Sequence, residues 1–271
     1  MKKAIQLELY RAFYNPAFWL ALAAGCVIAA AHFFQQVLPN TSHIYSGEEM
    51  AYPVTIFNSI LPMDYVGFYG NIYYYSIPLL CVLPFGVSYF QDVHTGYRKN
   101  ICVRVEKRAY LTGKYLAVFL SAGVICIAPL ILNLMLTAAV IPALVPQTGT
   151  NLFAVAEFSF MSEIFYSSPF LYLLLYFLMD FVMAGTLACV ALGASCFAKN
   201  PFAVLFAPFL LFFLLQALSS FSGYICWNPY NIMNPAGSAS VSLIHLAVEA
   251  SVFLLIGGGC LALEGGTRDV L

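Results

Sequence analysis

Long apolar runs are the feature that most constrains how this chain can fold. A helix rises about 1.5 Å per residue, so roughly 20 apolar residues cross a hydrocarbon layer about 30 Å thick. Six runs of this kind are present, covering residues 16–34, 72–90, 115–145, 170–197, 202–221 and 241–263. We therefore predict an all-α, polytopic membrane protein with six transmembrane helices, in which residues 1–271 form a single transmembrane domain.

The composition excludes an ordinary soluble domain. Only 8% of the residues are charged and 62% are hydrophobic, whereas soluble domains carry about 25% charged residues. The 8 cysteines include no C-x-x-C pair, so neither a zinc site nor a redox motif is indicated. Lipid is the solvent that suits such a chain.

The basic residues are confined to alternate loops, and this pattern predicts the orientation. All 11 Lys and Arg lie before the first span, between the second and third, between the fourth and fifth, or after the sixth. The other three loops contain none. Because basic loops are retained in the cytoplasm during insertion, we predict that both chain ends face the cytoplasm (N-in, C-in). The predicted location is a cell membrane, that of a bacterium being expected.

Two shorter segments have a character of their own. Residues 3–15 place Ile5, Leu9 and Phe13 four residues apart, among polar positions. This pattern is typical of an amphipathic helix lying in the cytoplasmic interface, although the segment could simply begin the first span. Residues 222–240 are predicted to be external, and a re-entrant path is an alternative for them.

Motifs for catalysis and nucleotide binding are absent from the sequence. It contains no G-x-x-x-x-G-K-[ST] loop, no H-E-x-x-H helix and no G-x-S-x-G elbow. The glycines at 257–259 lie inside a predicted span, where they are expected to allow close helix packing. We expect no enzymatic activity, no cofactor, no catalytic residue, no metal site and no nucleic-acid partner.

The largest polar feature predicted to face the cytoplasm is residues 91–114, with six basic and two acidic side chains. One interpretation is topological, because basic residues hold a loop inside and contact anionic lipid. The other interpretation is a docking surface for a soluble protein. Composition alone leaves both open.

Five positions in this segment carry a resemblance to a known family. Asp92, Gly96, Arg108 and the pair Gly113-Lys114 resemble the pattern of the ABC-2 type permeases, the membrane subunits of a large class of ABC transporters. The chain departs from that pattern because no threonine follows Gly96, no proline precedes the arginine, and the interval from Arg108 to Lys114 is short. The wider likeness, from the amphipathic helix to the aromatic segment before the sixth span, covers nearly the whole chain.

The resemblance implies a transport function that is divided between subunits. A separate cytoplasmic ATPase subunit would bind ATP, and a second permease subunit, identical or related, would complete a path for export of a drug, an antimicrobial peptide or a lipid-like cargo. Residues 91–114 would contain the coupling helix that receives the motion of the ATPase. The residues implied in this motif or contact zone are Asp92, Gly96, Arg98, Lys99, Arg104, Glu106, Lys107, Arg108 and Lys114. A minor second contact is implied at residues 199–201.

Polar side chains inside the predicted spans form a second group of candidates. Asp180 and Glu249 are costly to place in lipid, and such groups usually face a protein interior or a wet cavity. Each is either a contact for a proton, an ion or a substrate, or a protonated or hydrogen-bonded packing residue. Asn133, Gln216 and His245 are weaker candidates of the same kind. Two rival functions therefore stay open: a proton-coupled secondary transporter that uses Asp180 and Glu249, and a membrane assembly protein without transport.

Overall fold

The computed structural model describes residues 2–41, 54–64, 67–147, 153–156, 159–236 and 241–267. All regular elements in these residues are helices. The long ones are α2 (Pro16–His32), α8 (Lys107–Ala138), α10 (Pro169–Ala194), α11 (Pro201–Ser222) and α13 (Leu243–Thr267). The shorter ones are α1 (Lys2–Phe13), η1 (Phe33–Val37), α4 (Ile56–Ser59), α5 (Phe68–Leu80), α6 (Ser88–His94), α7 (Tyr97–Cys102), α9 (Ser162–Ser167), η2 (Ile225–Trp227) and α12 (Pro229–Met233).

Four helices in the described residues are long and apolar enough to cross a membrane. They are Pro16–Thr41, Lys107–Ala138, Pro169–Ala194 and Pro201–Ser222. The stretch Leu243–Gly259 of α13 is apolar but shorter. These helices are typical of a membrane protein. The predicted all-α class is confirmed, and the number of six spans stays a prediction.

The second predicted span, 72–90, is not one continuous helix. Helix α5 ends at Leu80, the chain passes through turns, and α6 begins only at Ser88. Pro78 lies inside α5 and Pro84 lies in the turns, and a proline lacks the N–H that an α-helix needs and clashes with the preceding turn. The 13 residues of α5 extend for about 20 Å, which is less than the hydrocarbon thickness. The prediction of a single helix over 72–90 is therefore wrong.

Helix α8 is displaced relative to the predicted third span, 115–145. It begins at Lys107 and ends at Ala138, so residues 107–114 belong to the helix and not to a loop. Pro129 lies inside α8 without ending it, whereas Pro142 follows the end. The early start reflects packing, because Ala109, Tyr110 and Gly113 are buried in the first turns.

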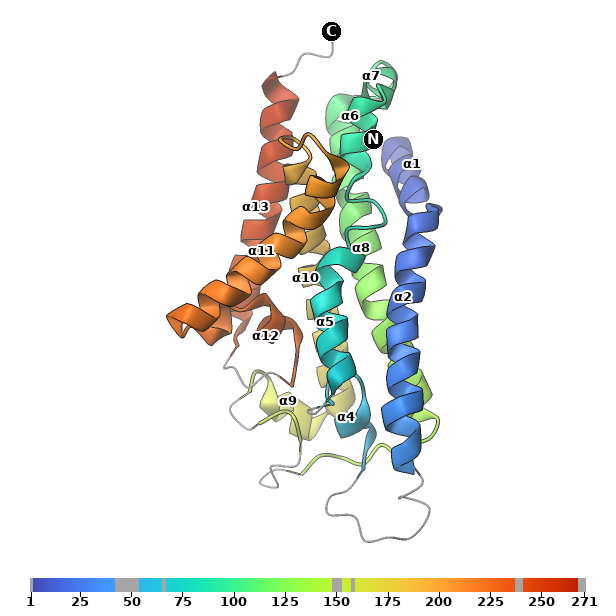
Figure 1. Cartoon of the computed structure of the whole chain (residues 1–271), viewed down its shortest axis with the longest axis vertical. Helices are drawn as coiled ribbons and strands as arrows, with labels where there is room; N and C mark the ends of the chain where they lie inside the picture. Colours follow the sequence, from blue (N-terminus) through green and yellow to red (C-terminus); the bar gives the residue numbers. More distant parts are fainter. Residues whose placement is uncertain are drawn as a thin grey trace.

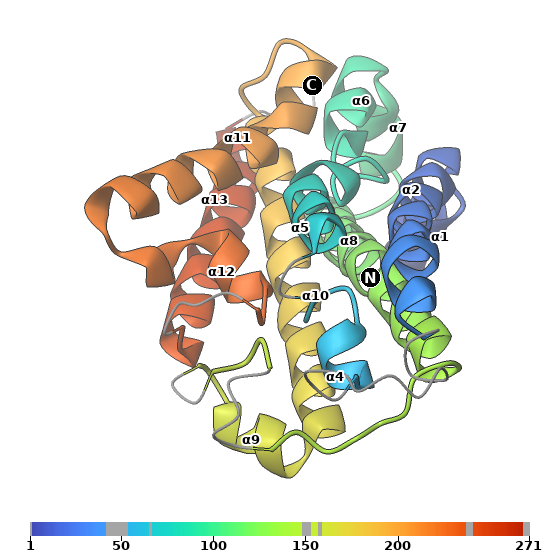
Figure 2. The same ribbon diagram turned by 60° about the horizontal axis from the view of Figure 1, so that its bottom comes forward.

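Helix α10 forms the centre of the bundle, as Figure 2 shows, and it contacts α5, α8, α11 and α13. Glycines allow the closest approach, between α10 and α13. A Cβ atom added at Gly193 would lie 2.6 Å from the carbonyl oxygen of Ile256, and one at Gly257 would collide with the carbonyl oxygen of Cys189. The expectation that the glycine run permits close helix packing is thus confirmed for Gly257.

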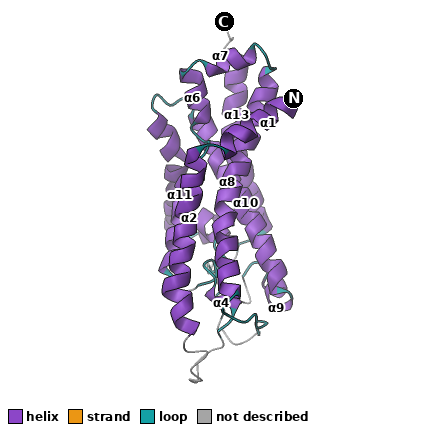
Figure 3. Ribbon diagram, turned by 90° about the vertical axis from the view of Figure 1, so that its right-hand side faces the viewer, coloured by secondary structure: helices purple, strands orange, loops and turns teal. Residues whose placement is uncertain are grey.

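The segments that carry Lys and Arg lie at one end of the bundle, together with α6 and the end of α13, which contain neither residue type. Figure 1 places α1, α6, α7 and the last turns of α13 together at this end, and α4 and α9 at the opposite one. The turn between α10 and α11, which contains Lys199, lies toward the same end. We call it the basic end. Figure 3 shows α1 there, tilted away from the direction of α2.

Helix α11 leans away from the rest of the bundle (Figure 2). Its side chains Phe202, Leu210 and Phe221 are exposed, with 93% of Phe221 accessible. The chain then returns through η2 and α12, where Ile232 and Met233 are buried. Of the segment predicted as external, residues 237–240 lie outside the described part of the chain, as does Arg268.

Candidate functional site

Helix α1 rests against the first turns of α8. Its residues Ala4, Glu8 and Ala12 are buried, and their spacing of four residues places them on one face of the helix. The contact is close, because a Cβ atom at Gly113 of α8 would lie 3.2 Å from Cα of Ile5. The polar residue Glu8 thus faces the protein, and not water as an amphipathic interfacial helix predicts.

The opposite side of α1 is uncovered, and Lys3 and Gln6 lie there beside large apolar and aromatic residues. Leu7, Tyr10 and Tyr14 are exposed, and the rings of the two tyrosines stack with centroids 4.1 Å apart. Tyrosines at such positions favour the headgroup region of a bilayer. The interfacial location of α1 stays a prediction, in which these three residues would contact the bilayer.

Between α1, α6 and α8, four charged side chains and a tyrosine form a buried ion cluster that joins the three helices. We use this name for Glu8 and Arg11 of α1, Asp92 of α6, and Tyr110 and Lys114 of α8. Arg11 binds Asp92 through two hydrogen bonds, of 2.7 Å to Oδ1 and 3.1 Å to Oδ2, and lies 3.0 Å from Glu8. Lys114 Nζ lies 2.6 Å from Asp92 and 2.7 Å from Glu8. The Tyr110 hydroxyl donates to Asp92 at 2.7 Å.

The charges of the cluster balance, with two carboxylates against two cations. Glu8, Asp92 and Lys114 are almost completely buried, whereas 29% of the Arg11 side chain is exposed. Aromatic rings cover both cations: Lys114 Nζ lies 4.5 Å from the ring centre of Phe85, and the Arg11 guanidinium lies 4.3 Å from that of Tyr97. Removing one member of a buried ion pair leaves the charge of the other without a partner, which strongly destabilises the fold.

The pKa values outside the spans follow from this geometry. Burial alone would raise the pKa of Asp92, but the hydrogen bond from Arg11 and the charge of Lys114 outweigh it and hold that pKa below its ordinary value. Burial alone would lower the pKa of Arg11, but the hydrogen bond to Asp92 and the charge of Glu8 raise it. Both groups are therefore ionised at neutral pH.

The predicted loop 91–114 divides into a buried part and an exposed part. Asp92 and Lys114 lie inside the protein, and Arg98 is buried with its guanidinium 5.6 Å from the ring centre of Tyr89. Gly96 directly precedes α7 and has a φ of 75°, a left-handed conformation that favours glycine.

The outer side of this loop forms a basic rim, the name we use for Lys99, Arg104 and Arg108. These side chains are exposed, as is Glu106 among them. Lys107 is half-buried. The structure therefore leaves the basic rim and Glu106 accessible to a partner, and gives Asp92, Arg98 and Lys114 contacts within the chain.

Among the candidates inside the spans, Asn133 has a clear packing role. Its Nδ2 donates to the Ala29 carbonyl at 3.0 Å and lies 2.9 Å from Nδ1 of His32. Its Oδ1 accepts from the Leu61 backbone N–H at 2.9 Å. Asn133 thus joins α2, α8 and the segment after α4.

His245 and Gln216 make simpler contacts. Nδ1 of His245 accepts from the Ser242 backbone N–H at 3.1 Å, just before the first turn of α13. Gln216 donates to the Tyr75 hydroxyl at 2.9 Å. The ring of Tyr75 stacks between those of Phe213 and Tyr230.

Asp180 and Glu249 are buried, and each keeps one carboxyl oxygen without a hydrogen bond to the described residues. The Tyr74 hydroxyl donates to Oδ2 of Asp180 at 3.4 Å, and Oδ1 is the oxygen without a partner. In Glu249 that oxygen is Oε2. A buried oxygen without a hydrogen-bond partner costs free energy.

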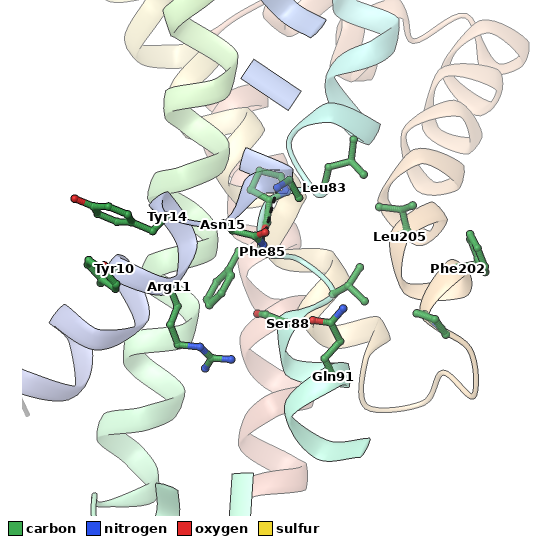
Figure 4. Close-up of a pocket in the computed structure, with 14 residues that line it drawn as sticks. Tyr10, Arg11, Tyr14, Asn15, Leu83, Phe85, Ser88, Gln91, Phe202 and Leu205 are labelled. Carbon is green, nitrogen blue, oxygen red and sulfur yellow. Dashed lines mark hydrogen bonds between the residues drawn. The ribbon is translucent and has the colours of Figure 1, made fainter. Parts of the chain in front are cut away.

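Beside the ion cluster lies a groove of about 580 Å³ (Figure 4). One wall comes from the junction of α1 and α2, where Asn15 donates to the Pro84 carbonyl at 2.6 Å. The floor comes from residues 83–91, and the other wall from the start of α11. Sequence reasoning missed this groove, because it depends on the break at Pro84.

Neither a candidate metal site in the described residues nor a similarity to known proteins restricts the range of possible functions. No group of three His, Cys, Asp or Glu side chains in the described residues could hold a metal ion. No protein-family model, curated protein or solved structure matches the chain.

Proposed function

We propose that this chain is the permease subunit of an ABC transporter of the ABC-2 type, which exports an amphipathic cargo with work supplied by a separate ATPase. The observation that carries the proposal is the connection between the basic rim and the membrane helices. Residues 92–114 run from α6 through α7 to α8, and the ion cluster ties both ends of this segment to α1. A displacement of α7 by the ATPase would therefore be transmitted to α1 and α8 together.

The ion cluster suits the transmission of motion. Separating Asp92 from Arg11 or Lys114 would leave a buried charge without its partner, which costs about 3–5 kcal/mol. The three helices are thus expected to move as a unit. Binding of ATP to the partner would shift the permease between inward-open and outward-open states, to the extent that the partner binds one state better.

The proposed topology has six crossings, with both chain ends in the cytoplasm of a bacterium. Residues 72–90, broken between α5 and α6, would form the second crossing, and α13 the sixth. The gathering of α1, α6, α7 and the end of α13 at one end (Figure 1) supports this orientation. A second permease subunit or lipid would cover the exposed apolar side chains of α11.

The experiment is a charge reversal of the basic rim. A triple variant Lys99→Glu/Arg104→Glu/Arg108→Glu should no longer copurify with the ATPase. The reversed, acidic rim would repel the acidic surface on the partner that a basic rim would bind. The control Lys3→Glu reverses one exposed charge on α1, outside the rim, and should retain binding. Membrane insertion of each variant is checked by fractionation. Unchanged ATPase binding in an inserted triple variant would remove the rim from the proposed role.

The unpartnered carboxyl oxygens of Asp180 and Glu249 favour a second candidate, a proton-coupled secondary transporter. Such a protein would transport cargo in sealed vesicles on a pH gradient without ATP. The variants Asp180→Asn and Glu249→Gln would abolish that transport. ATP-dependent transport that survives both substitutions would exclude this candidate and favour the first.

A further inference from the structure

The groove of Figure 4 has one polar corner. Arg11, Ser88 and Gln91 lie there, on α1 and α6. Ser88 is only 6% exposed, and its hydroxyl has no hydrogen-bond partner in the described residues. An unsatisfied buried hydroxyl is costly, so a ligand oxygen that accepts from it would be stabilised.

Arg11 has N–H donors that its hydrogen bonds within the protein do not use. Its bonds to Glu8 and Asp92 run through Nη1 and Nη2, and a guanidinium has five N–H donors in a fixed fork. Part of the side chain stays exposed toward the groove. The amide of the exposed Gln91 adds a further donor.

The net charge of the segments at the basic end, where the groove lies, favours an anion. Residues 2–11, 91–114 and 199 contain ten basic and three acidic side chains, which gives a net charge of +7. A field of one sign raises the local concentration of the opposite charge. Lys199 lies two residues before Pro201, which lines the groove.

The remaining lining is apolar. Leu83 on the floor and Leu205 on α11 face the cavity, with Phe202 beside it (Figure 4). Tyr10 and Tyr14 form the rim on the other side, and both are exposed. An occupant therefore needs a charged head for one corner and an apolar chain for the walls.

We infer that this groove binds an anionic phospholipid from the leaflet at the basic end. The phosphate lies against Arg11, Ser88 and Gln91, and an acyl chain lies along Leu83 and Leu205. The volume of about 580 Å³ falls within the range of ligand sites, about 300–1,000 Å³. The lipid bridges α1 and α6 to the start of α11. This inference stands on the groove alone and does not require the proposed transport function.

The test measures lipid retained by the full-length chain in detergent, by native mass spectrometry, with phosphatidylglycerol and phosphatidylcholine as probes. The wild-type chain retains phosphatidylglycerol in preference. The double variant Ser88→Ala/Gln91→Ala removes two head contacts without touching the ion cluster, and should weaken phosphatidylglycerol binding about tenfold. Phosphatidylcholine has the same phosphate but no net negative charge, so its weaker retention by the wild-type chain tests the role of charge.

A second variant tests the walls. Leu205→Trp fills the groove and should abolish the preferred binding, whereas Leu174→Trp, at an exposed position on α10 outside the groove, should not. Inorganic phosphate at the same concentration should fail to displace the lipid, because it lacks the acyl chain. Equal retention of the two lipids, full retention by Leu205→Trp, or displacement by phosphate would each overturn the inference.

Discussion

Replacement of Lys114 by methionine is the sharpest test of the ion cluster. Methionine keeps an unbranched apolar side chain, shorter than lysine by its terminal ammonium, and so removes the charge. In the structure Lys114 Nζ lies within 2.7 Å of a carboxylate oxygen of both Glu8 and Asp92. The variant therefore leaves two buried carboxylates with Arg11 as their cation.

The magnitude follows from the burial of these groups. Breaking a buried pair by removing one partner destabilises a protein by about 3–5 kcal/mol. Lys114 is 0% exposed and Asp92 is 2% exposed, so solvent cannot replace the lost charge. For a chain of this size we expect the midpoint of thermal unfolding to fall by on the order of 10 °C.

The assay follows thermal unfolding of the purified chain in detergent by intrinsic fluorescence. Arg104→Met is the matched control, because it removes an exposed cation from the same segment and should change stability by less than about 0.5 kcal/mol. The double variant Asp92→Asn/Lys114→Met should lose less stability than the sum of the losses in the two single variants, because the two residues interact. If Lys114→Met and Arg104→Met unfold alike, the cluster does not stabilise the fold.

Three further predictions concern other parts of the structure. The pKa of Asp92 lies below its ordinary value of 3.8, so its stabilising effect should be complete above that pH and be lost as the pH falls through the lowered value; the stability difference between wild type and Asp92→Asn, followed against pH, should shrink there. Gly257→Val should destabilise the chain by about 2 kcal/mol, measured by thermal unfolding, because its Cβ would meet the Cys189 carbonyl. Asn133→Leu should cost about 3 kcal/mol in the same assay, because it strands the Leu61 N–H and the ring of His32.

Helix boundaries with local signals are the part of the fold that the sequence predicts well. Helix α11 begins at Pro201 and ends at Ser222, close to the predicted 202–221. Its start is fixed by local chemistry, since the side chain of Asn200 accepts from the Phe202 N–H and Pro201 occupies the first turn. Helix α10 likewise has a proline, Pro169, in its first turn, close to the predicted start at residue 170.

The break after α5 escaped prediction for a different reason. A hydropathy window averages apolar character over a stretch of residues and does not detect a break in a helix, so residues 72–90 appear as one span. The signal that could have found the break is the pair Pro78 and Pro84. The early start of α8 escaped for a related reason, because Lys107 and Lys114 appear polar in a window although Lys114 is buried.

The ion cluster depends on contacts that no local pattern contains. Arg11 and Asp92 are 81 residues apart in the chain, and helical periodicity cannot show that their elements meet. The resemblance to ABC-2 type permeases singled out Asp92 and Lys114, but as motif positions of the coupling loop. The structure instead places them inside the protein, against Arg11 and Glu8.

Purification of the tagged full-length chain from its native membrane, followed by peptide identification of its partners, tests the central claim most directly. The account predicts a P-loop ATPase in the complex, lost on charge reversal of the basic rim. A chain that purifies without any ATPase, and transports its cargo on a pH gradient alone, would contradict it.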